Sequence, residues 1–328
     1  MMISARSETV AEVIHDARVR DRLVDRFGSL GNPCHDVPAS LALAEELRGC
    51  FAGEVRRAFR SLRDNPNAPP GVIVRDAGHD RSLPATPSAA GSLVDRPSHV
   101  GEWILLVLAS ALGTVVSYRE QRAGQLFNDI VPVKGFEDEI SSQGSRTALG
   151  LHRECTFSDV GPDFLGLYCH RGGGAATCVV SAARVAQRLT GQQWEVLSEP
   201  RFATPLPPAF RRGGASPAAP VPHCIFSGER DNPEIRIDTT LTRGSDAEAQ
   251  AVLEELNQIA ADDDLLERLV LEPGDVLFLD NRKCLHGREA FAARFDGSDR
   301  WLVRLYVKSD VWSCRARLVD DYVLAAGS

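Results

Sequence analysis

The sequence lacks the features that would assign it to several common classes of protein. Its 328 residues include 37 Lys and Arg against 45 Asp and Glu, so the net charge is −8, and the basic residues form no stripe. Nucleic acids and anionic membranes are therefore excluded as expected partners. The chain contains no G-x-S-x-G and no G-x-x-x-x-G-K-[ST] motif, which excludes a nucleophile elbow and a P-loop. A small molecule is the expected partner, and nothing in the sequence indicates an oligomeric state.

Signals of an exported or membrane-bound protein are also missing. The eight cysteines include no C-x-x-C pair and follow no regular spacing, so we expect reduced thiols rather than a disulfide framework or a structural zinc site. The charged N-terminus has no apolar signal-peptide core. The longest apolar run, residues 103–116, is shorter than the ~20 residues that span a bilayer. These features favour a cytoplasmic protein, and the apolar run predicts a buried helix followed by a strand.

The composition, with 43% hydrophobic and 25% charged residues, is that of a globular protein. Apolar residues recur at helical spacing over residues 9–63, and Ser98 is placed to cap the helix that follows it. We therefore expect residues 1–97 to form a helical and loop region packed on a core of residues 98–328. A lid-like insert is expected at about residues 185–270 of that core, and one decorated domain is favoured over two domains.

Short β-type runs separated by turns begin at Thr114. Eight such runs predict a mainly β protein with flanking helices, built as a barrel or jelly roll. They are TVVSY, LFNDIVPV, TALGLH, FLGLYCH, ATCVVS, EIRIDTT, DVLFLD and WLVRLYV. Seven prolines in residues 200–222 predict a loop that serves as a lid, and residues 246–271 predict an inserted helix. The glycines at 172–174 predict a hairpin turn between two strands.

Candidate metal ligands lie in two of these regions. His152 and Glu154 are two residues apart at the end of a predicted strand, so their side chains point to the same side. Such a pair also arises by chance in a chain with eight His and 45 acidic residues. His286, which follows the run DVLFLD, strengthens the case, although a loop histidine satisfied by the backbone is the alternative. Two His and one carboxylate on a β scaffold are the ligand set of non-haem Fe(II) sites that react with O₂.

Two arginines share one face of the last predicted strand. Arg300 and Arg304 are four residues apart, on the same side of an otherwise apolar run. Buried guanidinium groups need anionic partners, and their geometry suits carboxylates. The partners are either a carboxylate cosubstrate and a carboxylate substrate, or Asp and Glu side chains of neighbouring strands.

Residues 124–308 resemble the clavaminate synthase-like Fe(II)/2-oxoglutarate oxygenases, whose members include asparagine oxygenase and arginine hydroxylases. The resemblance rests on GQLFNDIVPV, on LHRE followed by PDFLGLYCHR, on GGGAATCVVS and on GDVLFLDNRKCLHGREAFAARFDGSDRWLVR. It implies a double-stranded β-helix, or jelly roll, that binds Fe(II) and uses 2-oxoglutarate and O₂ as cosubstrates.

The resemblance also implies roles for individual residues. It makes His152, Glu154 and His286 the iron ligands. The 2-oxoglutarate residues would be Arg300 for the distal carboxylate and Thr177 as its hydroxyl partner. The residues implied to bind an amino-acid substrate are Arg304 for the α-carboxylate, Gln125 and the second oxygen of Glu154 for the ammonium group, Ser142, and Asp238 for the side chain.

Two positions bear on which substrate is bound. An anion at Asp238 suits a basic side chain such as that of lysine or arginine, although a strand-end Asp bonded to its own turn is the alternative. Arginine hydroxylases of this group tend to present two acids here, whereas this chain has Thr239 and Thr240 after Asp238. This difference argues against recognition of a guanidinium group and leaves lysine or a neutral side chain open. Relatives often have a His or an aromatic residue just after the Glu ligand, where this chain has Cys155. The pocket beside the iron is therefore expected to differ.

The expected activity is hydroxylation of an unactivated carbon, Cβ or Cγ, of a free, basic L-amino acid in specialised metabolism such as antibiotic biosynthesis. The same iron site is compatible with desaturation or cyclisation, and with an amino acid held on a carrier. A zinc hydrolase would leave both arginines of the last strand unexplained. An inactive β-helix binding protein is the alternative outside the enzymes, although such a protein would usually have lost a ligand.

Overall fold

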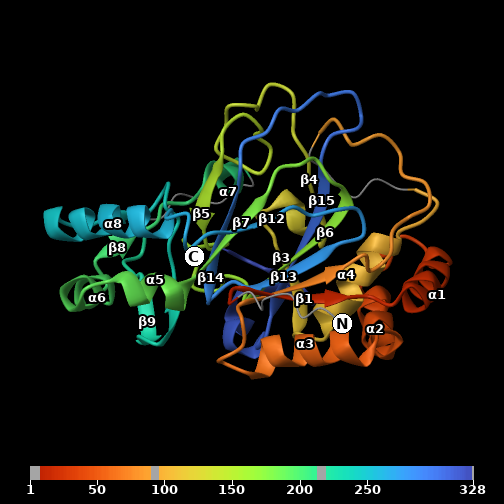
Figure 1. The fold of residues 1–328 in the computed structure, drawn as a ribbon, viewed down its shortest axis with the longest axis horizontal. Helices are drawn as coiled ribbons and strands as arrows, with labels where there is room; N and C mark the ends of the chain where they lie inside the picture. Colours follow the sequence, from red (N-terminus) through yellow and green to blue (C-terminus); the bar gives the residue numbers. More distant parts are fainter. Residues whose placement is uncertain (1–7, 90–95, 213–218, 327–328) are drawn as a thin grey trace.

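The computed structural model describes residues 8–89, 96–212 and 219–326. Two β-sheets form the centre of the molecule, with the N-terminal helices on the outer face of the larger sheet (Figure 1). A smaller unit of helices and short strands extends from the other end of the molecule, on the left of Figure 1. The expected mainly β architecture with flanking helices is confirmed.

The larger sheet has nine strands in the order β1-β2-β13-β6-β15-β3-β17-β16, with β4 also paired to β15. In that order they are β1 (Val10–Ile14), β2 (Gly71–Arg75), β13 (Val276–Asp280), β6 (Phe164–Arg171), β15 (Trp301–Lys308), β3 (Thr114–Tyr118), β17 (Val323–Leu324), β16 (Leu318–Asp320) and β4 (Asn128–Ile130). The smaller sheet consists of β12 (Glu267–Leu269), β7 (Thr177–Ser181), β14 (Cys284–Arg288) and β5 (Leu149–His152). Each of the eight predicted runs contains all or part of a strand.

The N-terminal region is partly helical and partly strand. Its helices, and those that follow before the smaller sheet, are α1 (Ala17–Gly28), α2 (Val37–Glu46), η1 (Leu47–Cys50), α3 (Gly53–Asp64), α4 (Val100–Ser110) and η2 (Arg122–Gly124). The helical reading of residues 10–14 is wrong, because this segment is strand β1, paired in parallel with β2. The boundary expected at residue 97 stays a prediction.

Helix α4 is buried on all sides and is followed by β3, as predicted from its continuous apolar sequence. The expected cap is wrong, because the Ser98 hydroxyl donates to Asp80 rather than capping the helix. Asp80 itself accepts a hydrogen bond from the Val100 N–H at 3.1 Å. A side chain distant in sequence therefore satisfies the first turn of α4.

The segment between β7 and β13 forms the smaller unit and has its own apolar core. Its elements are α5 (Ala182–Arg188), α6 (Gly191–Leu197), β8 (Phe202–Ala203), α7 (Pro208–Arg212), β9 (Phe226–Glu229), β10 (Asn232–Ile235), β11 (Arg243–Gly244) and α8 (Ala247–Ala260). The predicted helix at 246–271 is too long, since α8 ends at Ala260. The hairpin predicted at 172–174 is also wrong, because these glycines lead from β6 in the larger sheet to β7 in the smaller one.

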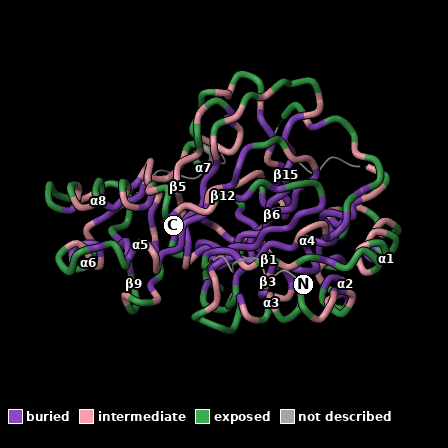
Figure 2. The backbone as a smooth tube through the Cα atoms, in the orientation of Figure 1, coloured by how far each residue is buried: buried purple, intermediate pink, exposed green. Residues whose placement is uncertain are grey.

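Buried residues are concentrated in the central strands and α4 (Figure 2), and they form two packed layers on opposite faces of the larger sheet. On β15, Val303 and Leu305 pack with the core that contains α4. Leu302 and Tyr306 point the other way and pack with residues of β6 and β7, between the two sheets. Even-numbered residues of β15 therefore face the interior of the β structure, where the candidate site residues lie.

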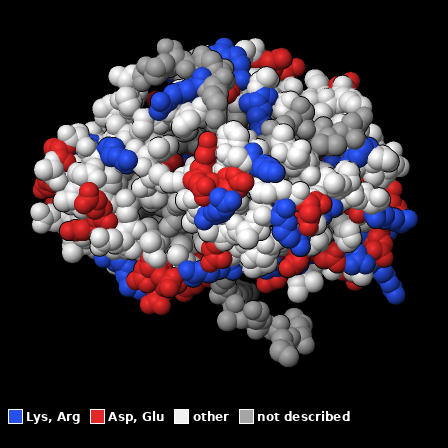
Figure 3. Space-filling view, turned by 90° about the horizontal axis from the view of Figure 1, so that it is seen from above, with Lys and Arg blue, Asp and Glu red and all other residues white. Residues whose placement is uncertain are grey.

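Charged side chains of both signs are intermingled on the face of the molecule drawn in Figure 3. The last helical element, η3 (Trp312–Arg317), leaves Trp312 71% exposed near the C-terminus. Within the described residues, none of the helices has the length and apolar character required to cross a membrane.

Candidate metal centre

Two histidines face each other across neighbouring strands of the smaller sheet. His152 on β5 is the register partner of His286 on β14, and their ring centroids are 4.4 Å apart. The Nδ1 atom of His152 lies 2.9 Å from the carbonyl oxygen of Gly150. Because a carbonyl only accepts, Nδ1 is the donor in this contact, and Nε2 is the ring nitrogen available to a metal ion. His286 is thus a strand residue, and the alternative of a loop histidine is wrong.

Glu154 completes a group of three. One potential ligand atom from each of His152, Glu154 and His286 lies within 4.8 Å of the others. The Oε1 atom of Glu154 is 3.6 Å from Nε2 of His286. His152 and Glu154 therefore converge, as the sequence predicted, although β5 ends at His152 and Glu154 lies in the turn that follows.

The charge states of these groups suit a cation. Burial, reinforced by the neighbouring His152, lowers the pKa of His286 to about 4. Burial alone would raise the pKa of Glu154, but Arg304 and the two histidines hold it well below its usual value. At neutral pH His286 is therefore neutral and Glu154 is ionised, which are the forms that bind metal ions.

The chemistry of these donors fits Fe(II). Two imidazole nitrogens and one carboxylate oxygen form the facial set of non-haem iron oxygenases, which leaves further positions for other ligands. The Nδ1 contact of His152 with a backbone carbonyl is the outer contact that typically orients a histidine ligand.

An inner cavity extends from this group between the two sheets. Its wall combines the three candidate ligands with three arginines, two hydroxyl side chains and apolar residues: Ile130, Ser142, Leu149, His152, Glu154, Leu165, Leu167, Thr177, His286, Gly287, Arg288, Arg300, Leu302 and Arg304. Arg300 Nη2 lies 3.4 Å from the Thr177 hydroxyl oxygen. Burial lowers the pKa of Arg300 to about 10. Among the described residues, no carboxylate forms an ion pair with Arg300, so the alternative of a protein partner is not realised for this side chain.

Arg304 on β15 and Arg300, which directly precedes that strand, line the same cavity, but Arg304 has an acidic partner. Its Nη1 atom donates to Glu154 Oε1 at 2.8 Å. The Tyr306 hydroxyl donates to the other carboxylate oxygen of Glu154 at 2.9 Å. The sequence reading missed Tyr306, although strand alternation from Arg304 would have placed it on this face.

Arg288 was also missed. It lies on β14 two residues after His286 and lines the inner cavity. Its Nη2 atom donates to the Thr147 carbonyl at 2.6 Å, and Nη1 donates to the Gly144 carbonyl. Burial lowers the pKa of Arg288 to about 10. It is therefore a third arginine in the wall that contains Arg300 and Arg304.

An outer cavity of about 510 Å³ adjoins the inner one, and His152, Glu154 and Arg304 line both. Its wall contains Gln121, Glu139, Ile140, Ser141, Ser142, Leu149, Gly150, His152, Arg153, Glu154, Cys155, Thr156, Phe157, Thr204, Pro207, Pro208, Phe210, Asp238, Thr240, Leu241 and Arg304. Ser142 lines both cavities. Gln125 is among the lining residues of neither, and its Oε1 atom is buried without a hydrogen-bond partner. Gln121, four residues earlier, lines the outer cavity.

Asp238 lines the outer cavity and forms an isolated β-bridge with His152. Its Oδ1 atom accepts hydrogen bonds from the backbone N–H groups of Thr240 at 2.8 Å and Leu241 at 2.9 Å. The turn contact considered as an alternative is therefore present, and it occupies one of the two carboxylate oxygens.

Comparison with known proteins gives consistent results. The model of the taurine catabolism dioxygenase TauD, TfdA family matches residues 98–306. L-asparagine oxygenase of Streptomyces coelicolor is 34% identical over 277 residues, which cover 83% of this chain and 81% of that protein. Enduracididine beta-hydroxylase of Streptomyces hygroscopicus is 32% identical over 326 residues, covering 92% and 93%. L-lysine 3-hydroxylase of Catenulispora acidiphila is 34% identical over 247 residues, covering 73% and 67%.

The fold is also that of a solved relative. The crystal structure of asparagine oxygenase with Fe(II), 2S,3S-3-hydroxyasparagine and succinate superposes with a TM-score of 0.85. The two sequences are 29% identical, and the match covers 96% of this chain and 99% of that one. The expected double-stranded β-helix is thereby confirmed.

Proposed function

The chain belongs to the TauD, TfdA dioxygenase family, and we propose that it uses Fe(II), 2-oxoglutarate and O₂ to hydroxylate a free L-amino acid at an unactivated carbon, Cβ or Cγ. The observation that carries this proposal is the convergence of two histidines and a glutamate in the wall of the inner cavity, where two of them also border the outer one. Asparagine, enduracididine and lysine are the amino acids in the names of the relatives.

His152, Glu154 and His286 would hold the iron. Bound Fe(II) would activate O₂, with one oxygen atom entering the substrate as hydroxyl and the other entering succinate as 2-oxoglutarate loses CO₂. The side chains contribute a neutral imidazole, an ionised carboxylate and a His152 ring oriented by the Gly150 carbonyl.

Arg300 and Thr177 would bind 2-oxoglutarate in the inner cavity. A buried guanidinium without an acidic partner matches a ligand carboxylate, which accepts two parallel hydrogen bonds from it. Thr177 Oγ1, which lies within reach of Arg300, would donate a further hydrogen bond to the same carboxylate. The apolar neighbours Leu165 and Leu302 would contact the methylene groups between the two ends of the cosubstrate.

Arg304, Glu154, Gln125 and Ser142 would bind the amino-acid backbone. Arg304 lines both cavities, and its buried Nε atom has no hydrogen-bond partner, so it retains a donor for the substrate α-carboxylate. Glu154 and Gln125 would accept from the ammonium group, with Ser142 at the junction of the two cavities. For Gln125 this role requires its amide to turn toward the outer cavity.

We propose a basic side chain for the substrate, with lysine and arginine as the first compounds to test. Asp238 keeps one carboxylate oxygen that its own turn does not occupy, and Glu139 also lines the outer cavity. An ammonium or guanidinium group would balance the charge of these acids. Phe157 and Phe210, whose rings are 4.7 Å apart, would cover the aliphatic part of the side chain.

The experiment is succinate formation from 2-oxoglutarate with Fe(II) and ascorbate against a panel of free L-amino acids, with mass analysis of the products. One basic amino acid should stimulate succinate formation and gain the mass of one oxygen atom. A product two mass units lighter would replace hydroxylation by desaturation or cyclisation. The free-substrate proposal fails if no amino acid stimulates turnover, and a carrier-bound substrate or an inactive binding protein would then be the better account.

A further inference from the structure

The three candidate ligands are positioned by different means. His152 and His286 are held in register by the ladder between β5 and β14. Glu154 lies two residues beyond the end of β5, and no strand of the described residues pairs with it. The chain turns sharply directly after it, since Cys155 has a φ of 54°, which is rare for a residue other than glycine. Something other than the sheet must therefore fix the backbone of Glu154.

The side chain of Asn281 makes the contacts that a neighbouring strand would make. Its Oδ1 atom accepts a hydrogen bond from the Glu154 N–H at 2.8 Å, and its Nδ2 atom lies 3.3 Å from the Glu154 carbonyl oxygen. The same Nδ2 donates to the Pro162 carbonyl at 2.8 Å, at the far end of the loop that begins with Glu154. Asn281 is only 1% exposed. One buried amide thus binds both backbone polar groups of a candidate metal ligand.

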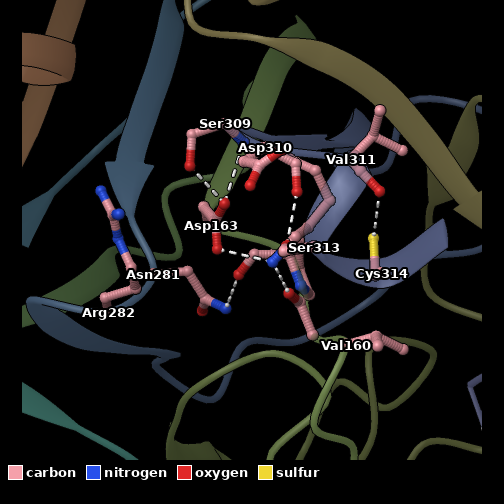
Figure 4. A network of polar contacts seen from close by, with 12 residues as sticks. Val160, Asp163, Asn281, Arg282, Ser309, Asp310, Val311, Ser313 and Cys314 are labelled. Carbon is pink, nitrogen blue, oxygen red and sulfur yellow. Dashed lines mark hydrogen bonds and ion pairs between the residues drawn. The ribbon is translucent and has the colours of Figure 1, made fainter.

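Asn281 is itself held firmly. It lies in the turn between β13 and β14, five residues before His286, and its N–H donates to the Asp163 carbonyl at 2.8 Å. Figure 4 shows Asn281 beside Asp163, whose carboxylate accepts from the Ser309 N–H at 2.8 Å. Lys308 Nζ forms an ion pair with Asp163 at 2.8 Å. The turn that leads to His286 is therefore connected through Asn281 to the backbone of Glu154.

We propose that Asn281 is a positioning residue that fixes Glu154 relative to the two histidines and thereby sets the affinity of the site for a divalent metal. This inference rests on the proposed function of the three ligands. Arg304 and Tyr306 contact only the Glu154 carboxylate, so neither replaces Asn281 at the backbone. Outer contacts of metal ligands typically change metal affinity 10–100-fold.

The test measures Co(II) binding by visible absorbance to the metal-free full chain, without any turnover. Asn281→Ala removes all three side-chain contacts, and Asn281→Asp replaces the donor Nδ2 by an oxygen facing two carbonyl oxygens. We expect both variants to raise the Co(II) dissociation constant about 10–100-fold. Asp163→Asn is the matched control, because it breaks the ion pair with Lys308 in the same buried network but touches no atom of Glu154. It should lower the unfolding midpoint and leave Co(II) affinity within about threefold.

Two results would overturn the inference: Asn281 variants that bind Co(II) as tightly as the unchanged chain, or an Asp163→Asn variant that loses as much affinity as Asn281→Ala. If the unchanged chain binds no Co(II) and forms no succinate, the proposed function fails as well. An active unchanged chain with normal binding in the Asn281 variants would reject only the role of Asn281.

Hydrogen exchange in the unchanged, metal-free chain tests the same point if the variants do not fold. The Glu154 amide should exchange as slowly as the amides of β13, because Asn281 accepts its hydrogen bond. Rapid exchange at Glu154 would show that the contact with Asn281 does not persist and would reject the inference.

Discussion

Two buried glutamates of this molecule have almost the same neighbours but different surroundings. Each lies among one arginine and two histidines. We call these sets the Glu102 cluster, formed by Arg96, His99, Glu102 and His170, and the Glu154 cluster, formed by His152, Glu154, His286 and Arg304. In both clusters the neighbouring groups hold the pKa of the glutamate below its usual value, although burial opposes this.

The clusters differ in what the carboxylate and the histidines face. Both oxygens of Glu102 accept from Arg96 Nη2, at 2.6 and 2.5 Å, and His170 Nε2 lies 2.8 Å from one of them. The Arg96 guanidinium lies over the Trp301 ring, 5.4 Å from its centroid. The residues that line the inner and outer cavities include no described member of this cluster.

In the Glu154 cluster, His152, Glu154 and Arg304 line both cavities and His286 lines the inner one, and the three potential ligand atoms converge. Among the described residues, this is the one group of His, Cys, Asp and Glu side chains with that geometry. Similar residue types therefore serve packing in one place and suit metal binding in the other. The two clusters differ in their access to the two cavities and in the direction of their potential ligand atoms, and not in the types of residue that form them.

The largest expected effect comes from removing one histidine from each cluster. His286→Ala should lower succinate formation about ten-thousandfold, equivalent to about 5.5 kcal/mol of barrier, because a ligand is lost. His170→Ala should keep turnover within about threefold at temperatures where the variant is folded. The measurement is succinate release with the best amino acid of the panel. Turnover by His286→Ala at a tenth of the normal rate would contradict the assignment.

Removing the arginine of each cluster should affect stability differently. Arg96→Met leaves Glu102 buried without its main partner, and we expect a loss of about 3–5 kcal/mol in urea unfolding. Arg304→Met should cost about 1–2 kcal/mol, nearer to the cost of a hydrogen bond, because Glu154 borders cavities that admit water.

A divalent metal should separate these two variants further. Co(II) can replace the positive charge beside Glu154, so it should restore the stability of Arg304→Met by binding the folded state. The Arg96→Met variant should remain less stable than the unchanged chain by the same free energy of unfolding with and without Co(II). Equal recovery in both variants would show that the clusters do not differ in access to metal.

Arg300 is a third buried arginine to compare, and among the described residues no Asp or Glu side chain forms an ion pair with it. Arg300→Met should raise the KM for 2-oxoglutarate about 10–100-fold, as expected for losing hydrogen bonds to a charged group. The KM for the amino acid should change less than threefold. Thr177→Val should raise the same KM by only about three- to tenfold, since one neutral hydrogen bond is removed. If Arg300→Met raised the KM for the amino acid more than the KM for 2-oxoglutarate, the proposed roles of Arg300 and Arg304 would have to be exchanged.

The smallest effect concerns pH and Asp129, which lies beside the Glu102 cluster and accepts from Trp301 Nε1 at 2.7 Å. Burial, together with the nearby charge of Glu102, raises the pKa of Asp129 to about 6. A raised carboxyl pKa favours the folded state at low pH, so this contribution is present below about pH 4 and is lost as the pH rises through 6. The loss should amount to about 1–3 kcal/mol.

Asp129→Asn should remove this pH dependence while keeping an oxygen for the Trp301 N–H. Urea unfolding from pH 4 to pH 8 should show the variant more stable than the unchanged chain at pH 7 and no more stable at pH 4. If the free energies of unfolding of the two proteins differed by the same amount at every pH from 4 to 8, the raised pKa of Asp129 would be contradicted.

The site residues that could be predicted from the sequence are those that lie within a few residues of one another along the same segment of chain. Alternation placed His152 with Glu154, and Arg300 with Arg304, before any partner strand was known. The same rule applied two residues further would have found Arg288 and Tyr306. The roles of Gln125 and Asp238 stay predictions, because they depend on how a substrate occupies the outer cavity.

The unpredicted part depended on contacts between distant segments. Strand β1 is specified by pairing with β2, some sixty residues later, and its few apolar residues fit helix and strand equally well. Asn281 has no local signal, because its partners lie more than a hundred residues away. The Glu102 cluster was also missed, since its contacts join α4, β6 and the segment before α4. Most of the fold followed from local pattern, but these contacts required knowledge of which segments are neighbours.

The pairing of β2 with β13 has a consequence for synthesis on the ribosome. The partner of β2 is residues 276–280, which are translated roughly 200 residues later. At about 5–20 residues per second, the N-terminal strands wait about 10–40 s for that partner. His286 is translated later still, so the three candidate ligands can come together only after this residue has left the ribosome.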